Sequence, residues 1–349
     1  MIFVTGGGTG GHYFPAVAVI ESLCTAGHNC VYLGASDGIE NALSKNLLCS
    51  VILTPGLKRH TLKQKLCLLP NLVKSTFILC KIFIQQRPDA LVAAGGYVSL
   101  LPCLIAKIFK VPIYLMEQNR IAGRVVKTFA KHAKLVACAM PLQNNLSAKC
   151  QVLGNPVSQK MILDSKSKTD ITTVKNILVM GGSASAEAID LALMDIALAG
   201  NLEGISVYHI ARPENKFKLQ AVYNSMGINA TVIGFCNDMA QYYLKADLVI
   251  ARAGASSISE LALFGIPAIL VPYPFAIDNH QYFNAKFVED SQGAILCEQG
   301  ENFVHRLSNE LKQLLSNNYK ITSMAKNIKS LSKPLAAYEI SKCISQDLK

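Results

Sequence analysis

Glycine-rich turns and a few polar side chains are the parts of this chain best suited to chemistry. The first turn, Gly6-Gly7-Gly8-Thr9-Gly10-Gly11, follows the apolar run 2–5 and is followed by His12. A buried strand that enters such a turn and opens a helix directs backbone N–H groups and the positive helix end at one spot. Glycine is needed there because a Cβ would block close approach of the backbone. The turn therefore predicts a binding site for phosphate or pyrophosphate.

This turn matches two nucleotide-binding patterns only in part. The Gly-Lys-Ser/Thr of a P-loop is absent, and His12 stands where the lysine would be. Gly6-x-Gly8-x-x-Gly11 fits the dinucleotide fingerprint, which also needs an acid at the end of the second strand. The apolar run 31–33 is instead followed by Gly34-Ala35-Ser36 before Asp37. A nicotinamide or flavin enzyme is therefore a minor alternative.

Two similar turns lie in the second half of the chain. Gly181-Gly182-Ser183 follows the apolar run 176–180, and Arg252-Ala253-Gly254-Ala255-Ser256 follows the run 248–251. Helix starts at Ser183 and Ala255 can share one diphosphate. Glu260 can direct a carboxylate at a vicinal diol, as acidic residues do when they bind ribose. The alternative is a solvated acid in the first turn of a helix, where the helix dipole favours it.

A further polar cluster consists of Asp278-Asn279-His280-Gln281 and Asn284. Its amide, imidazole and carboxylate groups suit sugar hydroxyls, and we expect it to begin a helix. For Asp278 the alternative is an ordinary helix N-cap.

Alternating strands and helices have to position these groups, and the apolar runs indicate where they lie. Such alternation is typical of an α/β fold in which a parallel sheet carries helices on both faces and ligands bind at the carboxyl ends of the strands. We expect strands at 2–5, 31–33, 51–53, 90–93, 113–116, 134–138, 176–180, 207–210, 231–233, 248–251 and 268–271. We expect helices over 14–23, 62–85, 184–198 and, at the C-terminal end, 335–344, and a further helix that follows Gly95-Gly96 and ends at residue 109.

The chain divides near residue 156. At 349 residues it is long enough for two cores, and Gly154-Asn155-Pro156 followed by the polar stretch 164–175 reads as a boundary with a surface linker. We expect an acceptor-binding and membrane-associating domain over 1–156 and a donor-binding domain over 157–332. We expect the C-terminal helix, 333–349, to pack back on the first domain.

Composition excludes several classes of protein. Hydrophobic residues make up 51% and charged residues 16% of the chain, which argues against disorder. The most apolar stretches, 66–84, 100–116 and 262–277, are broken by Lys, Pro or Gly too often to span a membrane. No signal peptide precedes the first strand, so we expect a cytoplasmic location. The eleven cysteines form no Cys-x-x-Cys pair or metal-ligand cluster, and most are expected to be reduced core thiols, such as Cys24, Cys80, Cys103 and Cys138.

All of the net positive charge lies in the first half. Residues 1–155 contain sixteen Lys and Arg against five Asp and Glu, whereas residues 156–349 contain eighteen of each. Lys63, Lys65, Lys74 and Lys81 interrupt the apolar segment 62–84. This pattern favours the surface of an anionic membrane over nucleic acid, because little aromatic or polar base-reading chemistry accompanies it. The alternative is an ordinary helix with one buried face.

Together these motifs resemble the MurG family, the peptidoglycan N-acetylglucosaminyltransferases that transfer GlcNAc from UDP-GlcNAc to lipid I to make lipid II. The matching motifs follow the family's order from residue 6 to residue 284. They are Gly7-Gly8-Thr9-Gly10-Gly11-His12, Gly95-Gly96-Tyr97-Val98-Ser99, Glu117-Gln118-Asn119, Gly154-Asn155-Pro156-Val157, Gly181-Gly182-Ser183, Arg252-Ala253-Gly254-Ala255-Ser256, Glu260 and Asp278-x-His280-Gln281-x-x-Asn284.

The resemblance implies a GT-B glycosyltransferase fold: two facing Rossmann-like parallel-sheet domains with an interdomain cleft. It assigns the acceptor pyrophosphate to Gly8, Gly95, Gly96 and Ser99. It assigns the donor UDP-GlcNAc to Thr9, Gly10, Gly11, Asn119, Ser183, Cys236, Arg252, Gly254, Ala255, Ser256, Glu260, His280 and Gln281. It implies no cofactor and no metal. Its expected partners are UDP-GlcNAc, lipid I, the anionic cytoplasmic face of the inner membrane and proteins of cell-wall synthesis or division complexes, but no nucleic acid.

The implied reaction is a single, inverting displacement by the acceptor's 4-hydroxyl, and the lack of an Asp-x-Asp pair fits metal-independent transfer. His12, Glu117 and Tyr97 are the catalytic candidates. His12 is the expected base, and its alternative role is to position the acceptor pyrophosphate. Ser158 stands where the family has an arginine that helps hold the nucleotide, and Met116 where a histidine is common. Two alternative functions are a related glycolipid synthase using another UDP-sugar and a non-catalytic membrane adaptor.

Overall fold

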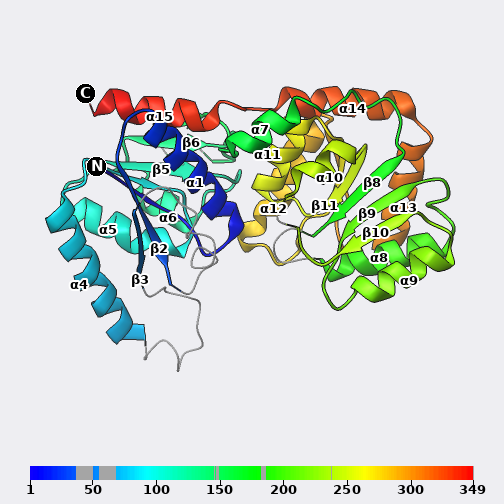
Figure 1. Ribbon diagram of the computed structural model, residues 1–349, viewed down its shortest axis with the longest axis horizontal. Helices are drawn as coiled ribbons and strands as arrows, with labels where there is room; N and C mark the ends of the chain where they lie inside the picture. The colour runs from blue at the N-terminus through cyan, green and yellow to red at the C-terminus, as the bar shows by residue number, and fades with distance from the viewer. Residues whose placement is uncertain are drawn as a thin grey trace. The chain divides into compact units, whose positions relative to one another are not determined.

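The computed structural model describes residues 1–36, 50–54, 68–144, 146, 149–181, 186–236 and 238–348. It forms two compact units (Figure 1). Unit 1 comprises Met1–Ser158 and Lys333–Lys349, and unit 2 comprises Gln159–Ser332.

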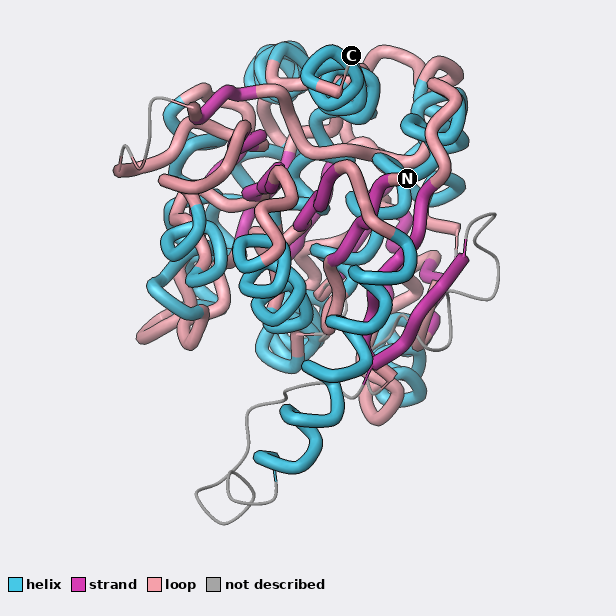
Figure 2. Tube along the Cα trace, turned by 90° about the vertical axis from the view of Figure 1, so that its left-hand side faces the viewer, coloured by secondary structure: helices cyan, strands magenta, loops and turns pink. Residues whose placement is uncertain are grey.

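Unit 1 contains a seven-stranded sheet in the order β3-β2-β1-β4-β5-β6-β7, in which every pairing is parallel. The central strands are short apolar runs buried on both faces, as a parallel sheet covered by helices requires. Figure 2 shows the strands side by side with helices packed around them. The strands are β1 (Ile2–Thr5), β2 (Cys30–Ala35), β3 (Ser50–Thr54), β4 (Ala90–Ala93), β5 (Ile113–Glu117), β6 (Leu135–Cys138) and β7 (Cys150–Val152).

The helices of unit 1 cover the two faces of this sheet. On one face, α1 and α15 pack over alternate side chains such as Val4 and Tyr32, and on the other α4, α5 and α6 pack over Phe3 and Leu91. The helices are α1 (Gly10–Thr25), α4 (Leu68–Gln86), α5 (Leu100–Ile108), α6 (Arg124–Phe129) and α15 (Ala336–Asp347), with the short 3-10 helix η2 (Tyr97–Ser99) before α5.

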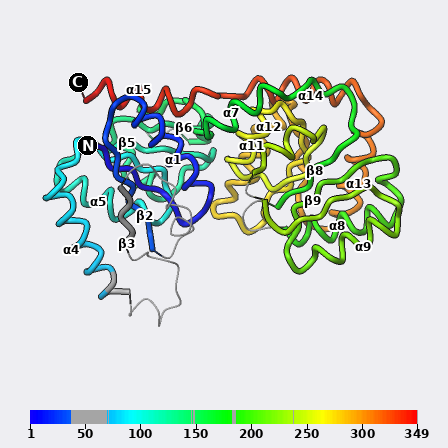
Figure 3. The backbone as a smooth tube through the Cα atoms, viewed as in Figure 1, coloured from blue at the N-terminus to red at the C-terminus, as the bar shows by residue number. Residues whose placement is uncertain are grey.

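Helix α15 belongs to unit 1 although it lies at the opposite end of the sequence. In Figure 3 it runs in red beside α1 in blue. Ile340 and Ile344 enter the same core as α1. The Oγ atoms of Ser22 and Ser341 are 2.7 Å apart, and the hydroxyl of Tyr114 donates to Oδ2 of Asp347 at 3.0 Å. The last helix therefore closes the sheet face that α1 covers only in part.

Unit 2 contains a six-stranded parallel sheet in the order β10-β9-β8-β11-β12-β13. Its strands are β8 (Asn176–Met180), β9 (Ser206–Ile210), β10 (Ala230–Ile233), β11 (Leu248–Ala251), β12 (Ala268–Leu270) and β13 (Ala294–Leu296). Its helices are α7 (Gln159–Ser165), α8 (Glu187–Leu198), α9 (Lys216–Ser225), α10 (Ala240–Lys245), α11 (Ala255–Phe264), α12 (His280–Asp290), α13 (Phe303–Leu315) and α14 (Asn318–Ser330), with the 3-10 helix η3 (Ile277–Asn279) before α12.

The predicted α/β fold with two parallel sheets is confirmed, and the expected strands are present. Two three-residue strands at sheet edges, β7 and β13, were not predicted. Helix α8 begins at Glu187 rather than at residue 184. Cys103 and Cys138 are buried as predicted, but Cys24 is exposed, so its assignment to the core is wrong.

Within the described part of the chain, no helix combines the length and the apolar character that crossing a bilayer requires.

Candidate functional site

The two glycine turns of unit 1 meet at the carboxyl edge of its sheet. Strands β1 and β4 are neighbours but continue toward opposite sides of the sheet, which is where open α/β sheets bind ligands. The backbone N–H of Ala94 donates to Thr5 O at 2.7 Å, which joins the two turns. Gly96 has a φ of +78°, and a Cβ there would lie 2.5 Å from Gly7 O. Only glycine allows the turns to pack this closely.

Tyr97, in the turn after β4, packs against the turn after β1. Gly8 has a φ of +81°, and a Cβ there would lie 2.5 Å from Cε1 of Tyr97, so the phenol ring packs directly against the backbone. The hydroxyl of Ser99 is buried and donates to Gly95 O at 2.7 Å. Ser99 is predicted to contact the acceptor, but in the structure its hydroxyl hydrogen is used in a bond that stabilises the turn.

His12 lies in the first turn of α1, and its ring orientation is set by neighbouring strands. Nδ1 is 2.9 Å from Ala94 O and 3.0 Å from Oε1 of Gln118. Both partners are acceptors, so in the neutral ring Nδ1 carries the hydrogen and the lone pair is on Nε2. Gln118 also donates from Nε2 to Ala94 O at 3.0 Å, which fixes its side chain. The arrangement therefore allows His12 to accept a proton at Nε2.

The start of α1 also supplies unsatisfied backbone donors. The first amides of any helix lack an intrahelical acceptor, and here these belong to Gly10 and Gly11, whereas the N–H of His12 donates to Thr9 O at 3.2 Å. Thr9 is the N-cap in an extended conformation, and its side chain makes no capping hydrogen bond. This helix start, with the threonine hydroxyl beside it, is suited to an anionic group.

Glu117 is buried at the end of β5, where it organises the turn that follows. Oε1 accepts from the backbone N–H of Asn119 at 2.9 Å, and Oε2 accepts from that of Gly123 at 2.6 Å. Burial raises the pKa of the Glu117 carboxyl, whereas these hydrogen bonds oppose the increase. The contacts fit a residue that positions Asn119.

In unit 2 the central turn follows β11. Helix α11 begins at Ala255 after Gly254, its N-cap. The Oγ of Ser256 is buried and has no hydrogen-bond partner in the described ranges of the chain. Such a group is costly unless a ligand or water completes it, so the first turn of α11 has unused hydrogen-bonding capacity.

Glu260 lies one turn further along α11. No acidic residue is in the first turn of this helix, so the alternative of a solvated first-turn acid is wrong. Its Oε2 accepts a hydrogen bond of 2.7 Å from the hydroxyl of Tyr243 on α10. Burial raises the pKa of Glu260 to about 7, and the Tyr243 hydrogen bond opposes that increase.

Arg252 is buried at the start of the same turn. Its Nη1 donates to Val271 O at 3.2 Å and Pro272 O at 3.0 Å, and Nη2 donates to Oε1 of Gln299 at 2.9 Å. The guanidinium therefore ties the segment after β11 to the segments after β12 and β13. These bonds suit a residue that holds the edge of the sheet together.

The 278–284 cluster is arranged differently from the expectation. The N-cap of α12 is Asn279 rather than Asp278, and both residues have a left-handed φ of +52°. His280 donates from Nδ1 to Ile277 O at 2.8 Å, which leaves the lone pair on Nε2. Oε1 of Gln281 accepts from the backbone N–H of Tyr273 at 2.9 Å. Asn284 is fully buried and donates to Ala253 O at 3.2 Å, so it supports the α11 turn.

Ser183 and Cys236 are two further predicted donor-binding residues. Ser183 lies outside the described residues, together with the rest of 182–185. Cys236 is partly buried after β10, the outer strand, and lies close enough to Tyr243 to contribute to the raised pKa of its hydroxyl.

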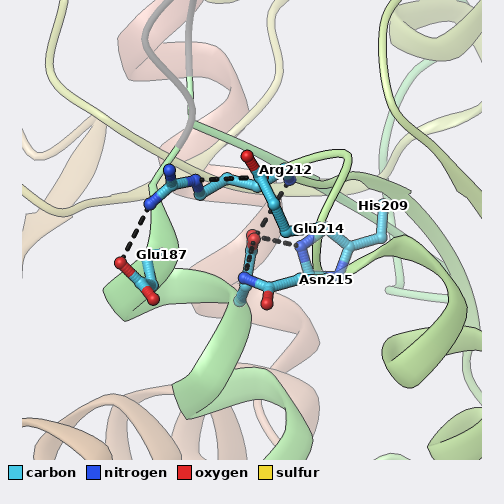
Figure 4. Close-up of polar contacts among 6 residues, drawn as sticks. Glu187, His209, Arg212, Glu214 and Asn215 are labelled. Carbon is cyan, nitrogen blue, oxygen red and sulfur yellow. Dashed lines mark hydrogen bonds and ion pairs between the residues drawn. The ribbon is translucent and has the colours of Figure 1, made fainter.

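A buried network at the end of β9 was not predicted (Figure 4). His209 and Asp190 are both buried, with Nε2 of His209 3.1 Å from Oδ1 of Asp190. The hydroxyl of Tyr223 donates to Nδ1 of His209 at 2.9 Å. Oδ2 of Asp190 accepts from the backbone N–H of Arg212 at 3.1 Å and from Nδ2 of Asn215 at 2.9 Å. The network joins the turn after β9 to the first turn of α8.

The outer part of this network is an exposed ion-pair cluster. Arg212 donates from Nη1 to Oε2 of Glu187 at 2.9 Å, and its Nε lies 3.4 Å from Oε2 of Glu214. The sequence signal for the inner part is an ionisable residue within an apolar run, namely Asp190 in a predicted helix and His209 in a predicted strand. No comparable signal marks Tyr243, because tyrosine is common in helices with one buried face.

No three His, Cys, Asp or Glu side chains are grouped as a metal site would need within the ranges the structure describes.

Comparisons with known proteins cover almost the whole chain. Residues 2–138 match the glycosyltransferase family 28 N-terminal domain, and residues 176–340 match the glycosyltransferase family 28 C-terminal domain. A protein of Pseudomonas paraeruginosa is 36% identical over 339 residues, covering 96% of this chain and 95% of its own length. A protein of Wolbachia pipientis from Culex pipiens is 34% identical over 352 residues, covering 99% of both chains.

Both relatives are named UDP-N-acetylglucosamine–N-acetylmuramyl-(pentapeptide) pyrophosphoryl-undecaprenol N-acetylglucosamine transferase. Among solved structures, MurG of Acinetobacter baumannii matches with a TM-score of 0.79 and 30% identity, covering 99% of each chain.

Proposed function

The chain belongs to glycosyltransferase family 28, and from this we propose that it transfers GlcNAc from UDP-GlcNAc to the 4-hydroxyl of MurNAc in lipid I, giving lipid II for peptidoglycan synthesis. The observation that carries this proposal is identity of 34–36%, over nearly the full length, with proteins named for this activity. No single motif has comparable weight, since a glycine turn alone is shared by many nucleotide-binding proteins.

His12 is the proposed base. The acceptor hydroxyl attacks C1 of the donor on the side opposite UDP, so that the C1–O bond to the diphosphate breaks as the new bond forms. The hydroxyl proton moves to Nε2 of His12, the nitrogen that carries the lone pair when Nδ1 donates to Ala94 O. Gln118 and Ala94 support this assignment because they hold the ring in one tautomer. Inversion at C1 follows from the single displacement.

Unit 1 is proposed to bind the acceptor. Gly8, Gly95 and Gly96 bring backbone close to the pyrophosphate, and Tyr97 and Ser99 support the turns through the contacts described above. Thr9, Gly10 and Gly11 face the donor phosphates, and Glu117 positions Asn119 toward the sugar. The supporting observation is that all these residues follow β1, β4 and β5, three neighbouring strands.

Unit 2 is proposed to bind UDP-GlcNAc. The amides of Gly254, Ala255 and Ser256 contact the diphosphate, together with Ser183, and the negative charge of the leaving group is stabilised by these helix ends rather than by a metal. Glu260 binds the ribose hydroxyls, the backbone at Cys236 reads uracil, and His280 and Gln281 bind GlcNAc. Arg252 acts indirectly, by fixing the edge of the sheet on which these groups lie.

Unit 1 also carries an exposed surface suited to an anionic membrane, which we name the α4–α5 face. Val73, Phe77 and Ile84 are exposed on α4, and Leu100, Leu104 and Ile108 are exposed on α5. The same helices carry the exposed lysines Lys74 and Lys81 on α4 and Lys107 on α5. Phe77 is 73% exposed and Ile108 is 67% exposed. Apolar and basic side chains combined in this way favour the headgroup region of an anionic bilayer. We propose peripheral binding to the cytoplasmic face of the membrane, where lipid I and other proteins of cell-wall synthesis are present.

The function is tested by incubating the purified chain with UDP-GlcNAc and a soluble lipid I analogue and measuring release of UDP. Release that requires both substrates is expected, with UDP-glucose and UDP-GalNAc as the matched donor controls. A chain that binds UDP-GlcNAc but never releases UDP would favour the adaptor alternative. Faster release from another UDP-sugar would favour a different glycolipid synthase.

A further inference from the structure

Tyr243 connects the proposed ribose-binding carboxylate to the core of unit 2. The residue lies on α10 and is 1% exposed, and its ring packs against Phe264 with centroids 5.3 Å apart. Its hydroxyl lies 3.5 Å from Sδ of Met180, at the end of β8, and donates to Oε2 of Glu260 at 2.7 Å. The hydroxyl therefore has a fixed position between the central strand and α11.

The other carboxylate oxygen is left for a ligand. Oε1 of Glu260 accepts from no residue in the described parts of the chain, and the hydroxyl of Ser256, one turn earlier on the same face of α11, also has no partner there. A carboxylate with one oxygen held by the protein has lost a rotational degree of freedom before the ligand arrives. Less entropy is then lost on binding.

We propose that Tyr243 is a positioning residue for donor binding: its buried hydroxyl holds Oε2 of Glu260 so that Oε1 is available to the vicinal hydroxyls of the ribose. This inference rests on the proposed function, because it concerns how the UDP part of the donor is recognised. It assigns a role to a residue that touches no substrate atom itself.

Electrostatics support the same arrangement. Burial raises the pKa of Glu260 to about 7, and the Tyr243 hydroxyl, which donates to the carboxylate, opposes that increase. The pKa of Tyr243 itself is raised well above its ordinary value, first by burial and then by Glu260 and Cys236, so the hydroxyl keeps its hydrogen. Each helix that contacts α11 carries a lysine with another partner: Lys286 pairs with Glu289, Lys329 donates to Leu263 O, Lys160 pairs with Asp164, and Lys245 lies over the ring of Tyr208.

The experiment compares Tyr243→Phe with the wild-type chain in titrations with UDP and with 2′,3′-dideoxy-UDP, which lacks the ribose diol. The substitution keeps the ring and its packing. We expect it to weaken UDP binding about 5- to 30-fold and to leave binding of the dideoxy nucleotide unchanged. The matched control is Tyr242→Phe, which removes a hydroxyl from the same helix at a residue whose ring packs against Tyr208, and it should bind both nucleotides like the wild type.

A second measurement separates positioning from general stability. Loss of the hydroxyl should move the pH at which UDP affinity declines to a higher value, since the ionised carboxylate loses a donor. UDP affinity within twofold of the wild type, an equal loss for both nucleotides, or an unchanged pH midpoint would each overturn the proposal. A wild-type chain that binds neither nucleotide would instead contradict the proposed function.

Discussion

The β1–α1 turn of unit 1 and the β11–α11 turn of unit 2 share a local plan but support their key side chains differently. Each is a buried strand followed by a turn of small residues and a helix start. His12 lies in the first turn of its helix and is held through one ring nitrogen by a backbone carbonyl. Glu260 lies in the second turn and is held through one oxygen by a buried phenol. The same backbone plan thus presents an imidazole, the proposed base, in one unit and a carboxylate, the proposed ribose ligand, in the other.

The two units also differ in their surfaces. The net charge of the chain lies in residues 1–155, and the exposed α4–α5 face is in the same unit. Residues 156–349 contain as many acidic as basic residues, and some of them pair with each other, as Arg212 does with Glu187 and Glu214. This contrast supports a division in which unit 1 meets the lipid substrate and unit 2 binds the soluble nucleotide.

The largest expected effect tests the role of the β1–α1 turn. His12→Ala should lower kcat roughly 10²- to 10⁴-fold, because a base acts in the transition state, with little change in the donor KM. Steady-state kinetics over a range of pH values would also lose the acid limb of the profile. Near-normal kcat at saturating acceptor would reduce His12 to a positioning role and remove the functional contrast between the turns.

The surface contrast predicts the next effect. Reversing the charge of Lys74 and Lys81 to Glu should weaken binding to anionic vesicles roughly 30- to 1000-fold at low salt, while turnover of a water-soluble acceptor survives. Vesicle sedimentation measures this, and the matched control reverses Lys218 and Lys326, which are exposed in unit 2. An equal loss of vesicle binding in the control would show that binding depends only on the net charge of the chain and does not require the α4–α5 face.

The β11–α11 turn predicts a smaller effect with the opposite kinetic signature. Glu260→Ala should weaken UDP-GlcNAc binding by roughly 1 to 3 kcal/mol, because the ribose loses a charged acceptor. In kinetics this should be seen as a raised donor KM with acceptor KM unchanged. Donor affinity equal to that of the wild type would remove Glu260 from the site and make the two turns functionally unrelated.

The smallest effect concerns stability and pH. The pKa of Glu260 in the folded chain is raised from 4.5 to about 7, so its protonated form favours the folded state. Its contribution is complete below pH 4.5 and is lost as pH rises through about 7. Because the Glu260 residue as a whole keeps some solvent exposure although its carboxyl is desolvated, we expect the loss to be about 1 to 2 kcal/mol. Glu260→Gln should abolish this part of the pH dependence in thermal unfolding, and an unchanged pH profile would contradict the assignment.

Much of the fold follows from local sequence. Short apolar runs such as 2–5 and 176–180 suit a parallel sheet that is covered on both faces, and the glycines that follow each run in the sequence suit a strand-to-helix turn. The three-residue strands β7 and β13 could not be recognised, because so short a run has no period and becomes a strand only beside an existing sheet edge.

The sequence by itself determined the order of the motifs, the position of the glycine turns, the charge contrast between the halves and the family resemblance, because each depends on residues close together in the chain or on composition. Only the tertiary structure decided which nitrogen of His12 carries the hydrogen, since Ala94 and Gln118 directly follow β4 and β5, which are distant from His12 in sequence. It likewise paired Glu260 with Tyr243 and Asp190 with His209. Protonation and orientation depend on burial and on partners that adjacent strands bring together, and these exist only once the sheet has formed.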